Sequence, residues 1–204
     1  MNLNDDVTMD AMPRIDRASL MTLETYARER PQFRARVIAH KKDRTVHLGD
    51  HVTLVFEDEL TIRYQVQEML RIERIFEEEG IREELAAYNP LVPDGRNLKA
   101  TMMIEYPDPG ERARRLAELI GIEDKVWLRA AGHERVWGIA DEDLDRENGQ
   151  KTSAVHFLRF ELDETTAQAL KKGASLTFAI DHPRYSATLE VPPAVRDSLA
   201  KDLA

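Results

Sequence analysis

The chain contains no cysteine, so its candidate chemical groups are histidines, carboxylates and arginines. The lack of cysteine excludes disulfides, thiolate nucleophiles and Cys-ligated zinc or iron–sulfur clusters. The segment HLGDH begins at His47 and ends at His51, and two histidines four apart on a helix can share a metal. Gly49-Asp50 instead predicts a two-residue turn that pairs Leu48 with His51 and sends the two imidazoles to opposite sides. We therefore expect no metal site here.

His156 lies in SAVHFLRFEL, a segment that alternates as a β-strand. The alternation places His156 on an apolar face with Leu158 and Phe160, and Arg159 on the other face. A histidine in such a setting is more often a core residue, hydrogen-bonded to backbone or a carboxylate, than a base or a ligand. We favour the structural interpretation and keep the functional one open.

Glu73 is the most unusual carboxylate in the helical segment RYQVQEMLRIERIFEEEGI, residues 63–81. At about 100° per residue, it falls inside the apolar arc formed by Ile62, Val66, Met69, Leu70, Ile72 and Phe76. A buried carboxylate needs a partner or a raised pKa. We predict that Glu73 is buried and paired with Arg96, Arg159 or His156, and that this pair is structural rather than catalytic.

Two loops contain further candidates. The stretch NPLVPDGRN, residues 89–97, holds two prolines and one glycine and is either a linker or part of a site. We expect it to lie against the fold, with the Arg96 guanidinium pointing inward. Asp181 and His182 occur in DHPRY, where ordinary turn chemistry explains the aspartate and the proline.

Common enzyme signatures are missing from the sequence. It contains no G-x-S-x-G, no G-x-x-x-x-G-K, no G-x-G-x-x-G, no H-E-x-x-H and no E-x-x-H. This counts against common enzyme classes and only weakly against rare ones. We expect no cofactor, and we leave open whether the protein is an enzyme.

The charge balance narrows the classes of partner. A net charge of −9 and a pI near 5.2 argue against general binding to nucleic acid or to anionic membranes, although residues 28–44 form a local basic stretch. No apolar run approaches the ~18 to 20 residues of a membrane span, and the acidic N-terminus does not resemble a secretory signal. We expect a cytoplasmic protein.

The hydrophobic patterning predicts an α+β fold with a largely antiparallel sheet built from hairpins and helices packed against it. Helices are expected at 16–30, 31–42, 59–80, 82–88, 108–121, 164–173 and from Pro193. Hairpins are expected at 45–56, 125–140 and 174–191, with strands at 98–106 and 153–162. We predict a tail at residues 1–14, an exposed acidic loop at 141–151 and a single domain at 15–204, with a possible sub-boundary near 89–97.

The segments RYQVQEMLRIERIFEEEGI, YNPLVPDGRNLKATMMIEYPD and KTSAVHFLRFEL together resemble a bacterial family of unknown function. Members of that family are often encoded beside rubrerythrin and an iron–sulfur oxidoreductase. The resemblance runs from about Ile15 to the C-terminal helix and brings no catalytic residues with it. It implies a setting in peroxide- or iron-linked redox metabolism, with any cluster carried by a partner.

Three functions remain open on this basis. The first, which we favour, is a non-catalytic accessory protein that binds a redox partner, either rubrerythrin or the iron–sulfur oxidoreductase. The second is an enzyme or small-ligand binder with a pocket around Glu73, Arg96, His156 and Arg159. The third, a histidine/carboxylate metal site, is weakest because the histidines are poorly spaced.

Overall fold

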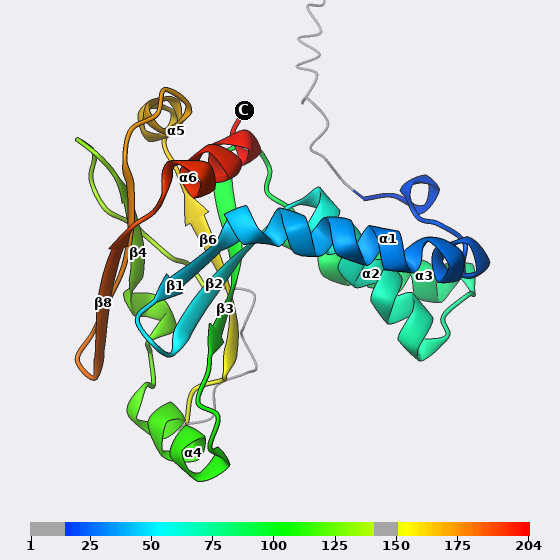
Figure 1. Ribbon diagram of the computed structural model, residues 1–204, viewed down its shortest axis with the longest axis horizontal. Helices are drawn as coiled ribbons and strands as arrows, with labels where there is room; N and C mark the ends of the chain where they lie inside the picture. Colours follow the sequence, from blue (N-terminus) through cyan, green and yellow to red (C-terminus); the bar gives the residue numbers. More distant parts are fainter. Residues whose placement is uncertain (1–14, 141–150) are drawn as a thin grey trace, which may run out of the picture.

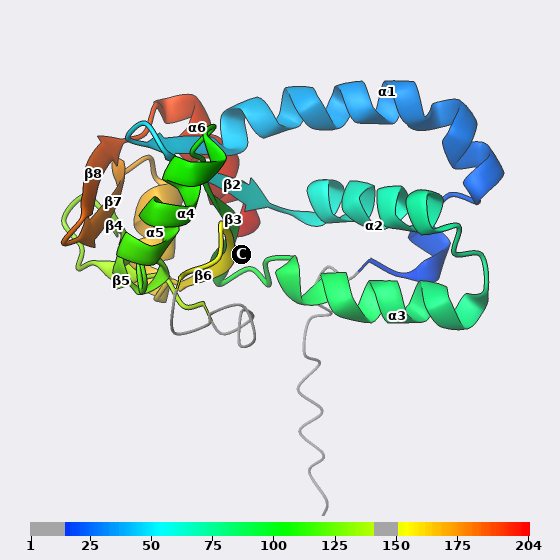
Figure 2. The ribbon, with the colours of Figure 1, turned by 90° about the horizontal axis from the view of Figure 1, so that it is seen from below.

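The computed structural model describes residues 15–140 and 151–204. The predicted tail at 1–14 and all but the last residue of the predicted acidic loop at 141–151 lie outside these residues. The fold is α+β and has two parts, a β body and a helical arm that projects from it (Figures 1 and 2). Within the described residues, no helix combines the length and the apolarity needed to cross a bilayer.

The β body contains two four-stranded antiparallel sheets. The first sheet has the order β1-β2-β3-β6 and is formed by Thr45–Leu48, Val52–Glu57, Asn97–Ile104 and Val155–Glu161. The second sheet has the order β5-β4-β7-β8 and is formed by Val136–Trp137, Val126–Ala130, Leu176–His182 and Tyr185–Glu190. The body also includes helices α4, Pro109–Glu118, α5, Glu164–Lys171, and α6, Pro193–Leu199.

The main core lies between the two sheets. Alternate residues of each strand point inward, so Phe56 and Phe160 of the first sheet meet Phe178 of the second, with ring centroids 5.0 and 6.0 Å from Phe178. Leu116 of α4 and Leu170 of α5 belong to the same buried cluster. The predicted hairpins and the predicted antiparallel sheet arrangement are confirmed, because short turns connect β1 to β2 and β7 to β8.

The helical arm consists of α1, Leu23–Lys41, α2, Glu59–Glu73, and α3, Glu78–Tyr88, which lie side by side in both views (Figures 1 and 2). The arm has cores of its own. Ile62, Val66 and Leu70 of α2 recur every four residues and pack with Ile81 and Leu85 of α3. The other side of α2 faces α1 through a separate cluster around Tyr26, Phe33 and Val37.

Helix α1 continues through Pro31, so the predicted division into two helices at this proline is wrong. Proline lacks the N–H that would bond to the carbonyl of Ala27 and costs a helix interior ~3 kcal/mol or more. Tyr26, Phe33 and Val37 are buried on both sides of it. Their packing against α2 offsets that cost, which sequence patterning alone does not reveal.

Helix α2 ends earlier than predicted. It stops at Glu73, and Arg74 adopts the left-handed conformation with φ 56° and ψ 42°. A second helix then begins at Glu78, so residues 63–81 form the end of one helix, a turn and the start of another. The predicted end near Gly80 is therefore wrong, although Asp58 caps the start of α2 as expected.

The first hairpin also differs in register from the prediction. Leu48 pairs with Val52 and His47 with Thr53, so the connection has three residues rather than two. The His47 ring lies 3.1 Å from the Thr53 hydroxyl, whereas His51 stacks on Tyr106 in the turn. Among the described residues, no group of three or more His, Asp or Glu is placed to hold a metal ion.

Candidate functional site

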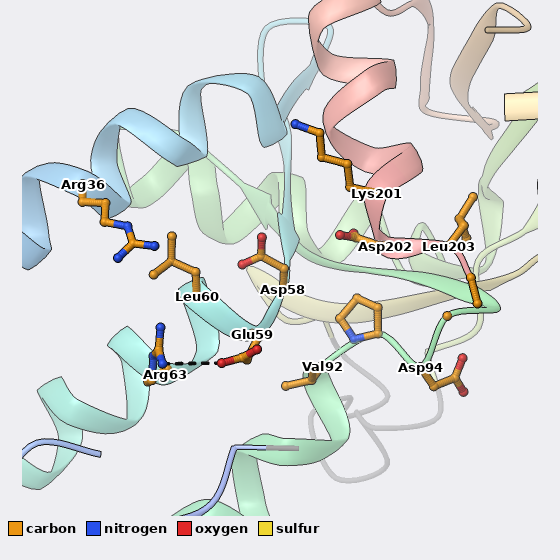
Figure 3. A pocket seen from close by; sticks show the side chains of 13 residues that line it. Arg36, Asp58, Glu59, Leu60, Arg63, Val92, Asp94, Lys201, Asp202 and Leu203 are labelled. Atoms are coloured by element: carbon orange, nitrogen blue, oxygen red, sulfur yellow. Dashed lines mark ion pairs between the residues drawn. The ribbon is translucent and has the colours of Figure 1, made fainter. Parts of the chain in front are cut away.

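A pocket of about 550 Å³ lies where the arm joins the β body (Figure 3). Four segments form it: α1, the first turn of α2, the loop at residues 92–95 and the C-terminal segment after α6. Its charged lining residues are Arg36, Asp58, Glu59, Arg63, Asp94, Lys201 and Asp202. We call this the junction pocket.

Local sequence signals position the α2 side of the junction pocket. Asp58 is the N-cap of α2 and accepts a hydrogen bond from the Thr61 N–H at 3.0 Å, while the Thr61 hydroxyl accepts one from the Asp58 N–H. This capping box holds the Asp58 carboxylate at the pocket wall. One turn later, Arg63 reaches back to Glu59 at 3.5 Å, an i,i+4 ion pair.

Arg44 is 1% exposed and contacts Asp58 and Asp202, two of the residues that line the junction pocket. Its guanidinium donates to the backbone carbonyls of Phe56 and Glu57, each at 3.1 Å, and to that of Ser198 at 3.2 Å. One side chain thus joins the end of β2 to the C-terminal helix α6. A buried cation with its donors satisfied in this way fixes the junction between arm and body.

Two aspartates share this arginine. Asp202 accepts a hydrogen bond from Arg44, and the Asp58 carboxylate lies 3.6 Å from the Arg44 Nε. His40 Nε2 lies 2.5 Å from the same Asp58 oxygen. We call Arg44, Asp58, Asp202 and His40 the junction cluster; a smaller pocket of about 210 Å³ also opens onto all four.

Burial raises the pKa of Asp202 to about 6, and the nearby Asp58 charge adds to the rise while Arg44 opposes it. Burial on its own would also raise the pKa of Asp58. Its Arg44 neighbour, the Thr61 N–H and His40 outweigh that effect, so the pKa of Asp58 is lowered. The two carboxyls therefore differ in proton affinity, and Asp202 has the higher pKa of the two.

We expect the free energy of unfolding to fall as the pH rises from about 4 to 6 through the contribution of Asp202. A pKa raised in the folded state means that the native protein binds more protons than the unfolded chain in that window. Urea unfolding of the wild type and of Asp202→Asn across pH 4 to 7 measures this. The wild type should lose stability relative to the variant as the pH rises; parallel curves would contradict the raised pKa.

Most charges around the junction pocket satisfy one another. Within the described ranges, only Arg36 and Lys201 among its cations form no ion pair. Those two cations can hold a small anion or an acidic side chain. The lining residues include no Ser, Thr or Cys to act as a nucleophile.

The comparisons with known proteins identify a family but no activity. Residues 14–203 match the model of a family described as protein of unknown function (DUF3501). The chain belongs to this family. A crystal structure of a novel protein of unknown function from Burkholderia pseudomallei K96243, at 1.90 Å resolution, is 55% identical to it, with a TM-score of 0.90 over 94% of this chain and 100% of that chain. No curated protein matches the chain.

The expected membership of a family of unknown function is therefore confirmed, whereas the rubrerythrin gene neighbourhood stays a prediction. The Burkholderia structure supports the fold described above, and the family description assigns no role to any residue. Any function has to be argued from the geometry of this chain.

In this DUF3501 protein Glu73 is exposed, so its predicted burial and pairing are wrong. Ile62, Val66 and Leu70 are buried as the helical phase predicts, but α2 ends at Glu73 and α3 begins only at Glu78. No apolar surface therefore covers the last turn. The nearby charged side chain is Glu84, whose pKa is raised by its own burial and then by the Glu73 charge.

Glu68 is the paired carboxylate of this stretch that is largely buried, whereas Glu78 pairs with Arg17 in an exposed position. The Glu68 side chain is 13% exposed and accepts hydrogen bonds from the Tyr26 hydroxyl at 2.7 Å and from Arg30 at 2.7 and 2.8 Å. Gln67, which the helical phase places on a solvated face, is buried and binds the backbone of Met21. Glu68 faces α1 and Gln67 faces the segment just before it, and sequence phase cannot show that α2 is covered on two sides.

The predicted pocket around Glu73, Arg96, His156 and Arg159 does not form. Arg96 is exposed, so its predicted inward orientation is wrong, and Arg159 pairs with Glu161 on the outer face of the first sheet. The loop that precedes β3 does lie against the fold as predicted, with Leu91, Val92 and Pro93 buried.

His156 is a core residue, as favoured from the sequence. It is 0% exposed, and its Nε2 lies 2.9 Å from the Thr152 hydroxyl, 3.0 Å from the Ser153 carbonyl and 3.8 Å from Glu123. It faces the space between the sheets, on the side opposite to Arg159. These contacts hold the Nε2 edge of the ring within the core.

Asp181 and His182 lie near the β7–β8 turn and point in different directions. Asp181 accepts hydrogen bonds from the Trp127 ring N–H and from Arg135, both at 2.9 Å. His182 is 9% exposed and lies 3.3 Å from the carbonyl of Ile120. These are contacts between neighbouring elements, which is consistent with turn and packing roles.

The junction cluster is what sequence reasoning missed. Only Asp58 carries a local signal, as an N-cap. Arg44 belongs to an ordinary basic stretch, and its partner Asp202 is 158 residues away. A DR pair immediately before a strand is too common to identify a buried arginine.

Proposed function

We propose that this protein is an accessory protein that acts by binding a protein partner through the free end of its helical arm. The observation that carries this is the exposure of two large apolar side chains there. Ile72 is 60% exposed and Phe76 is 67% exposed. They are the most exposed large apolar residues in the described part of the chain, and both lie where α2 turns into α3.

The arm end suits a partner of a particular charge. From Arg71 to Glu84 the sequence contains six glutamates and three arginines, so acidic groups outnumber basic ones around the apolar pair. A complementary surface would have an apolar patch with lysine or arginine at its rim. The projecting position of the arm leaves its end accessible to such a surface (Figure 2).

We further propose that the partner is a redox protein, either rubrerythrin or an iron–sulfur oxidoreductase. The gene neighbourhood expected for the family supports this choice. The acidic arm end requires that the partner have an apolar patch with basic residues at its rim. The role is then delivery, assembly or regulation of the partner, and any metal chemistry takes place there.

We expect the double variant Ile72→Gln, Phe76→Gln to bind the partner at least tenfold more weakly, because buried aromatic and aliphatic anchors dominate interface energy and tenfold is ~1.4 kcal/mol. Biolayer interferometry with purified rubrerythrin and the oxidoreductase from the same organism measures this. Both substitutions are at exposed positions, so the fold should persist, as circular dichroism will check.

Leu189→Gln is the matched control, since Leu189 is also apolar and 37% exposed but lies on β8 in the body. Its binding should match that of the wild type. Failure of the wild type to bind either protein would contradict the choice of partner. Undiminished binding by the double variant would contradict the role of the arm end.

A further inference from the structure

A second pocket, of about 250 Å³, lies between the outer face of the first sheet and the base of the arm. It differs from the junction pocket because its walls are largely apolar, with Val55, Met103 and Phe157 from three neighbouring strands. Ligand sites usually combine apolar walls with a few polar groups. We call this the sheet pocket.

Glu57 supplies the negative charge of the sheet pocket and is 8% exposed. Its Oε1 accepts a hydrogen bond from the Thr101 hydroxyl at 2.8 Å. Within residues 15–140 and 151–204, its Oε2 accepts no hydrogen bond and no cation forms an ion pair with it. Lys99, opposite Glu57 on β3, directs its ammonium group to the carbonyl of Pro90 instead.

The Glu57 Oε2 is not closed off from solvent and remains an open acceptor on the wall of the sheet pocket, where a ligand cation can replace water. Arg44 does not help, since it bonds to the backbone carbonyl of Glu57 rather than to its side chain. A ligand that brings a cation to Oε2 would supply the missing partner.

Two more polar groups lining the sheet pocket are available. Lys41, near the end of α1, makes no ion pair and Tyr88 makes no hydrogen bond through its hydroxyl among the residues that the structure describes. The sheet pocket thus presents one negative charge, one positive charge and one hydroxyl above an apolar floor.

We infer that the sheet pocket binds a small zwitterion with an apolar side chain, chemically a free apolar amino acid. Its ammonium group pairs with Glu57, its carboxylate pairs with Lys41, and its side chain packs on Val55, Met103 and Phe157. The volume lies just below the ~300 to 1,000 Å³ typical of drug-sized ligands, which fits an occupant of this size. This binding is independent of the arm end.

Isothermal titration calorimetry with leucine tests the assignment, with 3-methylbutylamine and 4-methylpentanoate as probes that lack one charged group each. At about 10 mM ligand, even binding near 1 mM is detected. We expect leucine to bind at least tenfold more tightly than either analogue. No binding of leucine, or equal binding of the amine, would overturn the inference.

Glu57→Gln keeps a side-chain oxygen for Thr101 and should weaken leucine binding at least tenfold, with an unchanged circular dichroism spectrum. Lys41→Met should do the same through loss of the carboxylate partner. Glu59→Gln is the matched control, because Glu59 lies two residues away and lines the junction pocket instead. Leucine binding that survives Glu57→Gln, or that is lost equally in Glu59→Gln, would overturn the assignment to the sheet pocket.

Discussion

Replacing Arg44 with alanine is expected to lower the free energy of unfolding by about 3–5 kcal/mol, the cost of removing one partner from a buried ion pair. Arg44 is 1% exposed and donates to three backbone carbonyls and to Asp202. Its removal leaves these acceptors without their hydrogen-bond donor. It also leaves the neighbouring Asp58 and Asp202 carboxylates without the cation that they share. Urea unfolding at pH 7 measures the loss.

Arg34→Ala is the control for the Arg44 variant, because Arg34 is exposed on α1 and should change stability by no more than about 0.5 kcal/mol. A double-mutant cycle with Asp202→Asn separates the charge pair from the carbonyl contacts. If the losses in the free energy of unfolding are additive, the ion pair with Asp202 does not explain the effect of removing Arg44. Equal small effects for Arg44→Ala and Arg34→Ala would mean that the junction cluster does not hold the arm to the body.

Replacing Glu68 with alanine is expected to destabilise the protein by about 2–4 kcal/mol, from the loss of charged hydrogen bonds and the stranding of a buried hydroxyl. Tyr26, which is 0% exposed, donates a hydrogen bond from its hydroxyl to Glu68. Glu73→Ala, five residues later on the same helix, should stay within about 0.5 kcal/mol because Glu73 is exposed. Chemical denaturation of the two variants gives the comparison directly.

The pH dependence of the Glu68 contribution has a definite sign. The hydrogen bond from Arg30 lowers the pKa of Glu68 to about 2, and the Tyr26 and Arg71 contacts act in the same direction. A lowered pKa stabilises the fold above the ordinary value of 4.5, and this stabilisation is lost as the pH falls towards 2. The difference between wild type and Glu68→Ala should therefore shrink in acid. A difference that is constant from pH 7 to pH 3 would contradict the pairing.

Local sequence signals determined most of the secondary structure. Asp58, Asp108 and Asp163 each cap the helix that was expected to follow them, because a side-chain oxygen before a helical run satisfies a backbone N–H of its first turn. Strand alternation likewise placed His156 on the buried face and Arg159 on the outer face. These features depend on residues within a few positions of one another.

The tertiary structure alone decided which charged groups are buried and which of them are paired. The local pattern singled out Glu73 rather than Glu68, yet α1 covers Glu68 and Glu73 is exposed. The pairing of Arg44 with Asp202 joins residues 158 positions apart, and Glu57, Lys41 and Tyr88 line one pocket only because the base of the arm lies beside the first sheet. The energy of a charge depends on its burial and its neighbours, and both are set by packing between elements that the local sequence does not encode.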